Sequence, residues 1–160
     1  MKIERFEIPG LAQYSYVVSA GGFALVVDPI RDIDRYIVYA ANQDLKITHV
    51  TETHIHADFA SGATALVAAT GAELAVSGYD VDQHYQYSMP HRALRHGDCM
   101  EIGTVTVRAL HTPRHTPEHV SFAVFDKERN AGVTVALLSG DFLFVGSLGR
   151  KSKASPGNST

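Results

Sequence analysis

Three polar motifs, each placed at the end of an apolar run typical of a β-strand, most strongly constrain how this chain can fold. They lie at residues 53–62, 110–119 and 137–142 of the 160-residue sequence. Histidines gather around the first two motifs, since three of the nine lie within 49–56 and three within 111–119. Polar residues at the carboxyl ends of strands are typical of the sites of open α/β folds. The pattern therefore favours an α/β fold with one site built from distant segments.

Hydropathy patterns predict a strand-rich domain over residues 1–150, made of short apolar strands and two helices. The predicted strands are residues 3–8, 14–19, 23–28, 46–53, 72–77, 104–110, 119–125 and 133–139. Apolar residues at helical spacing predict one helix from an Asp32 N-cap to about Asp44, and a second from Ser61 to a stop at Gly71. The order βββαβαβ, followed mostly by strands, favours mixed rather than all-parallel sheets.

Three connections between these elements are also predicted. Gly21-Gly22 is a hairpin turn signal between the second and third strands. Residues 79–91 are polar and aromatic and are expected to be irregular, and residues 126–132 are expected to form a charged turn.

Composition and charge exclude several classes of protein. Fourteen basic against seventeen acidic residues give a net charge of −3, which argues against a nucleic-acid binder. No apolar run approaches the roughly 20 residues of a membrane span, and the N-terminal residues lack the apolar stretch of a signal peptide. Together with a single cysteine, Cys99, this predicts a cytoplasmic protein without disulfides. The polar tail at residues 151–160 is predicted to be disordered.

The first motif combines two histidines and an aspartate at the end of a strand. His54 and His56 are two residues apart, so both rings point to one side of an extended chain. Asp58 follows two residues further on. We interpret the three side chains as converging metal-site residues; the alternative is a solvated polar loop.

The second motif surrounds His115 with two prolines. Pro113 and Pro117 restrict φ, so the backbone can hold the His115 side chain rigidly, which suits a metal ligand. We interpret His111 mainly as a hydrogen-bonding structural residue, and His119 as a core or surface residue at the start of the next strand.

In the third motif, Asp141 follows an apolar strand and Gly140. This placement projects a carboxylate from a strand end. Gly-Asp is also a common turn pair, so Asp141 is a candidate site residue only in combination with the other two motifs.

Together the three motifs resemble those of the metallo-β-lactamase superfamily. The pattern is His-x-His-x-Asp, then His-Thr-Pro-x-His-Thr, then Gly-Asp, and Asp28-Pro29 after the third predicted strand agrees with it. The resemblance covers about residues 3–150 and implies a four-layer αββα sandwich. Within the superfamily, residues 52–62 and 139–146 most resemble the persulfide dioxygenases, in particular the bacterial type fused to rhodanese domains.

The resemblance implies one Fe(II) per chain, held by His54, His115 and Asp141. It implies oxidation of a low-molecular-weight persulfide, such as glutathione persulfide, with O₂ to sulfite and free thiol. Two imidazoles and one carboxylate form the facial triad of non-haem iron oxygenases, which leaves coordination positions open for sulfur and O₂.

Three further residues receive roles from the same resemblance. His56 and Asp58 would orient the ligands and receive protons. Arg150 stands in the family's Gly-Arg position and would help to bind the substrate.

The sequence departs from the family pattern at two positions, Phe59 and Arg114. Phe59 stands where two-zinc hydrolases carry a histidine, and phenylalanine has no lone pair for a second metal. This disfavours the alternative reading, a zinc-dependent thioesterase of the glyoxalase II type. Arg114 stands at a usual glycine position and would be strained if its φ were positive.

The chain also stops soon after Gly149-Arg150, where family members continue. One sheet is therefore expected to be incomplete, and the apolar surface left uncovered would favour homo-oligomers. A third hypothesis follows, namely a non-catalytic metal-binding fragment.

Overall fold

A computed structural model shows the fold of most of the chain. It describes residues 1–8, 13–57, 60–79, 87, 89–130, 132–144 and 147–148. Asp58, Phe59, Arg150 and the tail at 151–160 lie outside the described residues, so the expectations for them remain predictions.

The first sheet has six strands, which follow chain order from one edge to the other. They are β1 (Lys2–Ile8), β2 (Gln13–Ala20), β3 (Phe23–Val27), β4 (Lys46–Thr51), β5 (Glu73–Ser77) and β6 (Arg92–Leu94). β1 to β3 run antiparallel, whereas β3 to β6 run parallel. Gly21 and Gly22 join β2 to β3 with φ values of 58° and 82°, which is the hairpin turn predicted from the sequence.

The second sheet has four antiparallel strands in the order β10-β9-β8-β7. They are β7 (Cys99–Ile102), β8 (Val105–His111), β9 (Val120–Asp126) and β10 (Thr134–Leu138). A separate pair, β11 (Leu143–Phe144) and β12 (Ser147–Leu148), follows. The sequence pattern misses β6 and β7, because three and four residues are too few to show a period.

Helix α1 (Asp34–Asn42) confirms the first predicted helix, but the predicted cap is wrong. The N-cap is Ile33, and no side chain caps the helix. Asp32 instead pairs with Arg35, with 3.5 Å between Oδ2 and Nε.

Helix α2 (Ala63–Thr70) confirms the second predicted helix, including its end at Gly71. The charged turn predicted at 126–132 is wrong in part, since Lys127–Asn130 form the short helix α3. A 3₁₀ turn, η1 (Gly140–Phe142), follows β10 and carries Asp141.

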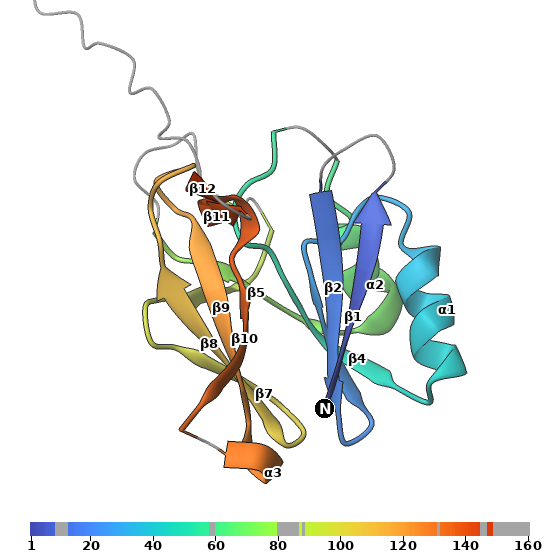
Figure 1. The fold of residues 1–160 in the computed structure, drawn as a ribbon. Coiled ribbons are helices and arrows are strands. Elements are labelled where there is room, and N and C mark those ends of the chain that lie inside the picture. Colours follow the sequence, from blue (N-terminus) through green and yellow to red (C-terminus); the bar gives the residue numbers. More distant parts are fainter. Residues whose placement is uncertain are drawn as a thin grey trace, which may run out of the picture.

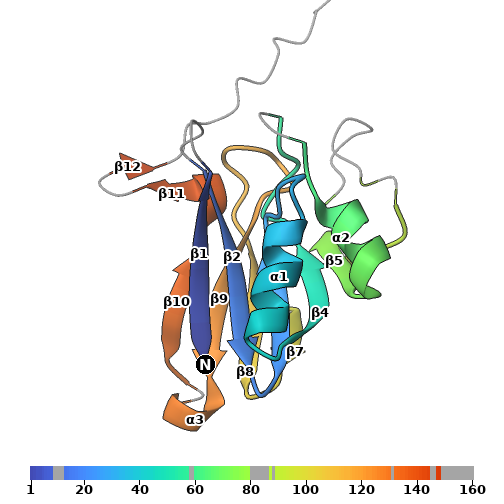
Figure 2. The ribbon, with the colours of Figure 1, turned by 90° about the vertical axis from the view of Figure 1, so that its right-hand side faces the viewer.

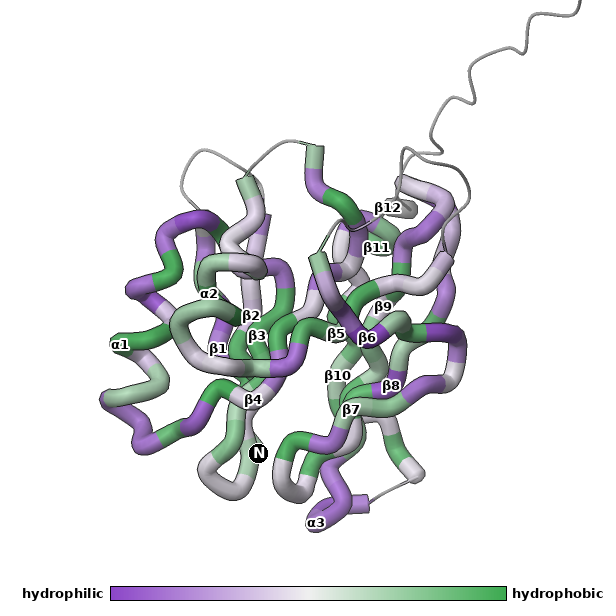
Figure 3. Tube along the Cα trace, turned by 180° about the vertical axis from the view of Figure 1, so that it is seen from behind, coloured by the Kyte–Doolittle hydropathy of each residue, from purple (hydrophilic) through white to green (hydrophobic). Residues whose placement is uncertain are grey.

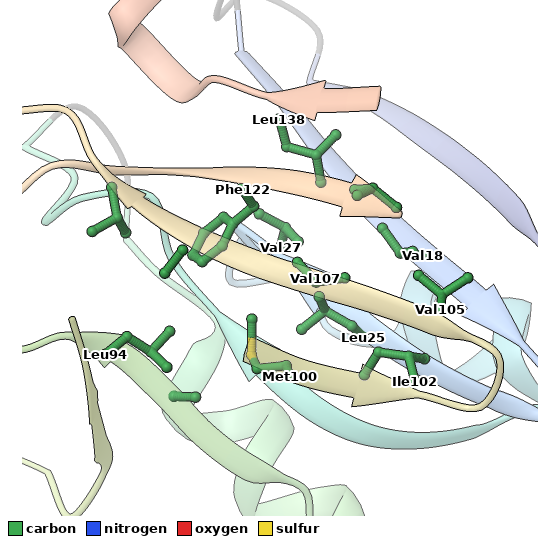
Figure 4. Packing of buried hydrophobic residues seen from close by; sticks show 14 of the residues in the cluster. Val18, Leu25, Val27, Leu94, Met100, Ile102, Val105, Val107, Phe122 and Leu138 are labelled. Atoms are coloured by element: carbon green, nitrogen blue, oxygen red, sulfur yellow. The ribbon is translucent and has the colours of Figure 1, made fainter. Parts of the chain in front are cut away.

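Two apolar clusters hold the layers together. The first lies between the two sheets and includes Val18, Leu25 and Phe122, all fully buried (Figure 4). The second lies between the first sheet and the helices α1 and α2, where Tyr36 and Leu66 are fully buried. In Figure 3, hydrophobic segments run along the central strands, α1 carries both hydrophobic and hydrophilic residues, and α3 is hydrophilic.

The layers stack as helices, first sheet and second sheet (Figures 1 and 2). The predicted α/β fold with mixed sheets is therefore confirmed. Within the described residues, the second sheet has only the short α3 near one end, so three of the four predicted layers are seen. None of the helices in those residues is both long and apolar enough to cross a bilayer.

Candidate metal centre

Three side chains from distant segments meet at one end of the sandwich, the upper end in Figure 1. His54 follows β4, His115 lies between β8 and β9, and Asp141 lies in η1 after β10. Their ligand atoms all lie within 4.8 Å of one another. His115 Nε2 and Asp141 Oδ2 are 3.6 Å apart, and the rings of His54 and His115 are nearly perpendicular, at 85°. We call these three residues the ligand cluster.

His54 is held as a neutral ring with one nitrogen fixed. Burial lowers the pKa of His54 to about 3, with the neighbouring His56 adding to the effect. Thr53 Oγ1 donates to Asp28, so it accepts a hydrogen bond from His54 Nδ1 at 3.0 Å. The lone pair of His54 is then on Nε2, which is the tautomer that a metal ligand needs.

Asp28 organises the neighbouring backbone and the other histidine of the first motif. Its buried carboxylate accepts the Thr53 backbone N–H at 2.7 Å and His56 Nε2–H at 3.1 Å. Burial alone would raise the pKa of Asp28, but the hydrogen bonds from His56 and Thr53 outweigh it and hold the pKa below its usual value. Gln13 Nε2 donates to the remaining nitrogen of His56, at 3.1 Å.

His56 therefore does not join the ligand cluster, because protein groups engage both of its ring nitrogens. Its ring lies 4.1 Å from the ring of His54, so it contacts a member of the cluster. The predicted role of His56 in orienting a ligand stays a prediction.

A second group of buried residues ties the two histidine motifs together. Glu118 is fully buried and accepts the Ile55 backbone N–H at 2.9 Å. Val120 N–H donates to the Thr53 carbonyl at 2.7 Å. The ring of His119 stacks on that of His54 at 5.1 Å, and its Nδ1 lies 2.9 Å from Thr112 Oγ1. Neither Glu118 nor the place of His119 beside the cluster is predicted from the sequence, because neither residue has a distinctive spacing.

Two other expectations are settled by local geometry. Within the described residues, only Asp28 and Asp44 combine a side chain with a positive φ, so Arg114 carries no such strain. His111 Nε2 contacts the Pro117 carbonyl at 3.0 Å and its ring stacks on Tyr79, in keeping with a structural role.

The ligand cluster suits a divalent cation that solvent can reach from one side. His54 is buried, whereas the side chains of His115 and Asp141 are 40% and 31% exposed. Two imidazoles and one carboxylate match the donor set that non-haem Fe(II) prefers, and zinc also accepts these donors.

We expect the metal-free protein to lose stability when the pH falls from 6.5 towards 4. Burial lowers the pKa of His54 to about 3 and that of His119 to about 4, so below 6.5 the unfolded chain binds protons that the folded chain does not. Each histidine then contributes a slope of up to about 1.4 kcal/mol per pH unit. Glu52 acts in the opposite direction, because burial raises its pKa to about 7. As the pH falls below 7, the folded chain therefore binds a proton that the unfolded chain does not, and the protein gains stability. This gain stops below pH 4.5, the unperturbed pKa, where the unfolded chain binds the proton as well. Among these three groups the two histidines outweigh the one carboxyl, so their combined contribution to stability falls as the pH falls.

Urea unfolding of the metal-free protein between pH 4.5 and 7.5 measures this. His119→Gln should reduce the slope, because it removes one of the two buried histidines. A free energy of unfolding that stays flat or rises on acidification would contradict the assignment of neutral buried rings.

Gly140→Ala is expected to destabilise the protein by about 2 kcal/mol or more, given the usual cost of overpacking and of a positive φ. A Cβ at Gly140 would lie 2.5 Å from Thr53 Oγ1 and 2.9 Å from His119 Nε2, at a φ of +47°. Gly132→Ala is the matched control, because its Cβ would meet only Asn130 Oδ1 at 3.5 Å. Thermal or urea unfolding of both variants measures the difference; equal losses would rule out the tight contact.

Comparisons with solved structures support this architecture. The chain is similar to a metallo-β-lactamase from Staphylococcus aureus, with 41% identity, a TM-score of 0.90 and coverage of 96% of this chain and 47% of that one. It is also similar to ETHE1 from Myxococcus xanthus, with 28% identity, a TM-score of 0.76 and coverage of 94% and 61%.

Curated relatives point to the same superfamily. A cytoplasmic hydroxyacylglutathione hydrolase from Arabidopsis thaliana is 35% identical over 154 residues, which is 94% of this chain and 56% of the relative. A hydroxyacylglutathione hydrolase from Rhodospirillum rubrum is 32% identical, covering 90% and 53%. The chain thus spans about half the length of the curated relatives it matches. The profile of the metallo-β-lactamase superfamily matches residues 8–159. The chain therefore belongs to the metallo-β-lactamase superfamily, as its three motifs predict.

Proposed function

We propose that this chain is a one-metal persulfide dioxygenase, which holds Fe(II) and converts a glutathione-type persulfide, O₂ and water to sulfite, thiol and two protons. One observation carries the proposal. The second histidine of the first motif, His56, is engaged by Asp28 and Gln13, whereas the first histidine, His54, lies with His115 and Asp141. A two-metal hydrolase site would use both histidines of that motif as ligands. Phe59 in the sequence supports the same choice, since it cannot bind a second metal.

The ligand cluster and its neighbours would have different roles in the reaction. His54, His115 and Asp141 would hold the iron, which supplies redox chemistry and open coordination positions when bound. Thr53 fixes the tautomer of His54 through Nδ1. His56 keeps a proton on Nε2, where Asp28 accepts it.

Buried residues close one side of the ligand cluster to water. Glu118 and His119 are fully buried behind His54, so solvent and substrate approach from the side of His115 and Asp141. Charge that develops at the ligand cluster during the reaction would therefore interact with the fixed groups of Glu118 and His119 on the buried side and with the substrate on the open side.

A second candidate is a zinc-dependent thioesterase acting on a glutathione thioester. The curated relatives favour it, because they are named hydroxyacylglutathione hydrolases and reach 35% identity. Both candidates use a glutathione-type substrate. They differ in the metal, in the number of ions and in the bond that reacts.

The experiment separates the two candidates by metal content and reaction. Protein purified without oxygen is loaded with Fe(II) or with Zn(II), and its metal content is measured. We expect about one iron per chain and O₂ uptake driven by glutathione persulfide. Two zinc ions per chain with cleavage of a glutathione thioester would establish the hydrolase instead. Metal binding with neither reaction would reject both and leave the non-catalytic fragment.

A further inference from the structure

A cavity of about 290 Å³ opens directly beside the ligand cluster. Its walls come from β1 and β2 on one side and from the end of β10, η1 and β11 on the other. Figure 2 shows β1 and β10 at the same edge of the sandwich. Asp141 lines the cavity, so the cavity and the cluster share a residue. Its volume is close to the lower limit for a small-molecule site.

Among the described residues that line this cavity, one is a cation, Arg5. The alternation of β1 places Ile3 on the side of the core between the sheets and Phe6 on the opposite side, against Tyr36 of α1. Arg5 therefore points towards the space between the sheets, and it lines the cavity. It is exposed, and within the described part of the chain it forms no ion pair with a carboxylate.

Two tyrosines lie next to Arg5 in the same cavity. The guanidinium carbon of Arg5 lies 4.5 Å from the centre of the Tyr14 ring, and Tyr16 is the register partner of Arg5 in the sheet. Neither tyrosine hydroxyl makes a hydrogen bond within the described residues. A guanidinium held against an aromatic ring, with two hydroxyl donors beside it, matches the chemistry that binds a carboxylate.

The acidic groups of the cavity do not cancel this charge. Asp28 lines the cavity, but its carboxylate accepts hydrogen bonds from Thr53 and His56. Asp141 also lines it, and under the proposed function it faces the metal. Of the side chains that the structure describes in the cavity wall, Arg5 is therefore the cation available to an anion that enters.

We propose that Arg5, with Tyr14 and Tyr16, forms a subsite that binds a carboxylate of the substrate while its sulfur lies at the ligand cluster. The subsite selects thiol derivatives that carry a carboxylate remote from the sulfur, as glutathione does, over thiols without one. This inference rests on the proposed function for the position of the sulfur. The recognition of the carboxylate is independent of which metal is bound.

Calorimetric binding to the metal-loaded full chain tests the subsite without any turnover. The probes are glutathione and its diethyl ester, which lacks free carboxylates. In Arg5→Gln, we expect the affinity for glutathione to fall about ten- to hundredfold, which is the usual worth of a charged hydrogen bond. The affinity for the ester should stay the same.

Two further variants complete the design. Arg5→Lys keeps the charge and should retain part of the affinity. Arg129→Gln is the matched control, because Arg129 is exposed on α3 at the opposite end of the sandwich (Figure 1). It should bind glutathione as the unchanged protein does.

The outcomes separate the subsite from the proposed function. Unchanged glutathione binding in Arg5→Gln, or an equal loss for the ester, would overturn the subsite even if O₂ uptake is observed. An Arg5-dependent loss restricted to glutathione would support the subsite even if no O₂ uptake is found, and only the proposed reaction would then fail.

Discussion

His115→Ala is expected to remove metal binding and, with it, all metal-dependent turnover. His115 supplies one of three donors, whose ligand atoms lie within 4.8 Å of one another. Substitution of groups that only hydrogen-bond to the ligands lowers metal affinity by about 10–100-fold. Loss of a ligand itself should therefore lower metal affinity by more than about a hundredfold. The side chain of His115 is 40% exposed, so the variant should fold.

Two measurements check this prediction. Metal content after dialysis should fall from about one ion per chain to a small fraction. Added metal should stabilise the unchanged protein by about 2.7 kcal/mol at a hundred times its dissociation constant, and should not stabilise the variant. His91→Ala is the control, because His91 is an exposed histidine outside the cluster. Full metal binding by His115→Ala would refute the assignment.

Asp28→Asn is expected to destabilise the protein by about 2–3 kcal/mol, the value of hydrogen bonds to a buried charged group. The carboxylate accepts the Thr53 N–H at 2.7 Å, the Thr53 hydroxyl at 3.0 Å and His56 at 3.1 Å. The φ of Asp28 is 52°, a conformation that asparagine tolerates as well as aspartate does. The substitution therefore removes the charge without disturbing the backbone. Because Thr53 orients His54, metal affinity should fall as well.

The chain offers a closely matched control for Asp28. Asp44 also has a positive φ, of 51°, but its side chain is exposed. Asp44→Asn should therefore stay within about 0.5 kcal/mol of the unchanged protein. Urea unfolding measures both variants, and equal effects would show that the hydrogen bonds of Asp28 contribute nothing.

Acid pH provides an additional check on Asp28. Its pKa is lowered in the folded protein, so its stabilising contribution is present above the unfolded value of 3.8 and is lost as the pH falls below it. The difference in stability between the unchanged protein and Asp28→Asn should therefore shrink below about pH 3.8.

The ligand cluster was predictable because its members are marked by local pattern. His54, His115 and Asp141 each follow an apolar run, and each run forms a strand: β4, β8 and β10. Strand ends collect polar residues at one edge of a sandwich, so the position of each motif in the chain already indicated a common site. The helix at 34–42 and the hairpin turn at Gly21-Gly22 were predictable for the same kind of reason, a short-range pattern.

The partners of those residues were not predictable. His56 lies in the same strand-end motif as His54, yet Asp28 and Gln13 engage both of its ring nitrogens. Glu118 reaches Ile55 only because β9 begins beside the first motif. Such contacts join residues far apart in the chain, so the periodic pattern of hydrophobic residues does not predict them.

Local pattern is enough to predict the strand-rich α/β fold and the three donors of the candidate metal centre, because the side-chain period and the position of a residue at a strand end are local properties. Two features depend instead on packing: His56 pairs with Asp28, and Arg5 of the first strand lines the same cavity as Asp141. Hydrogen bonding and burial depend on which distant segments share a space, and the packing of the two sheets against each other sets which segments these are.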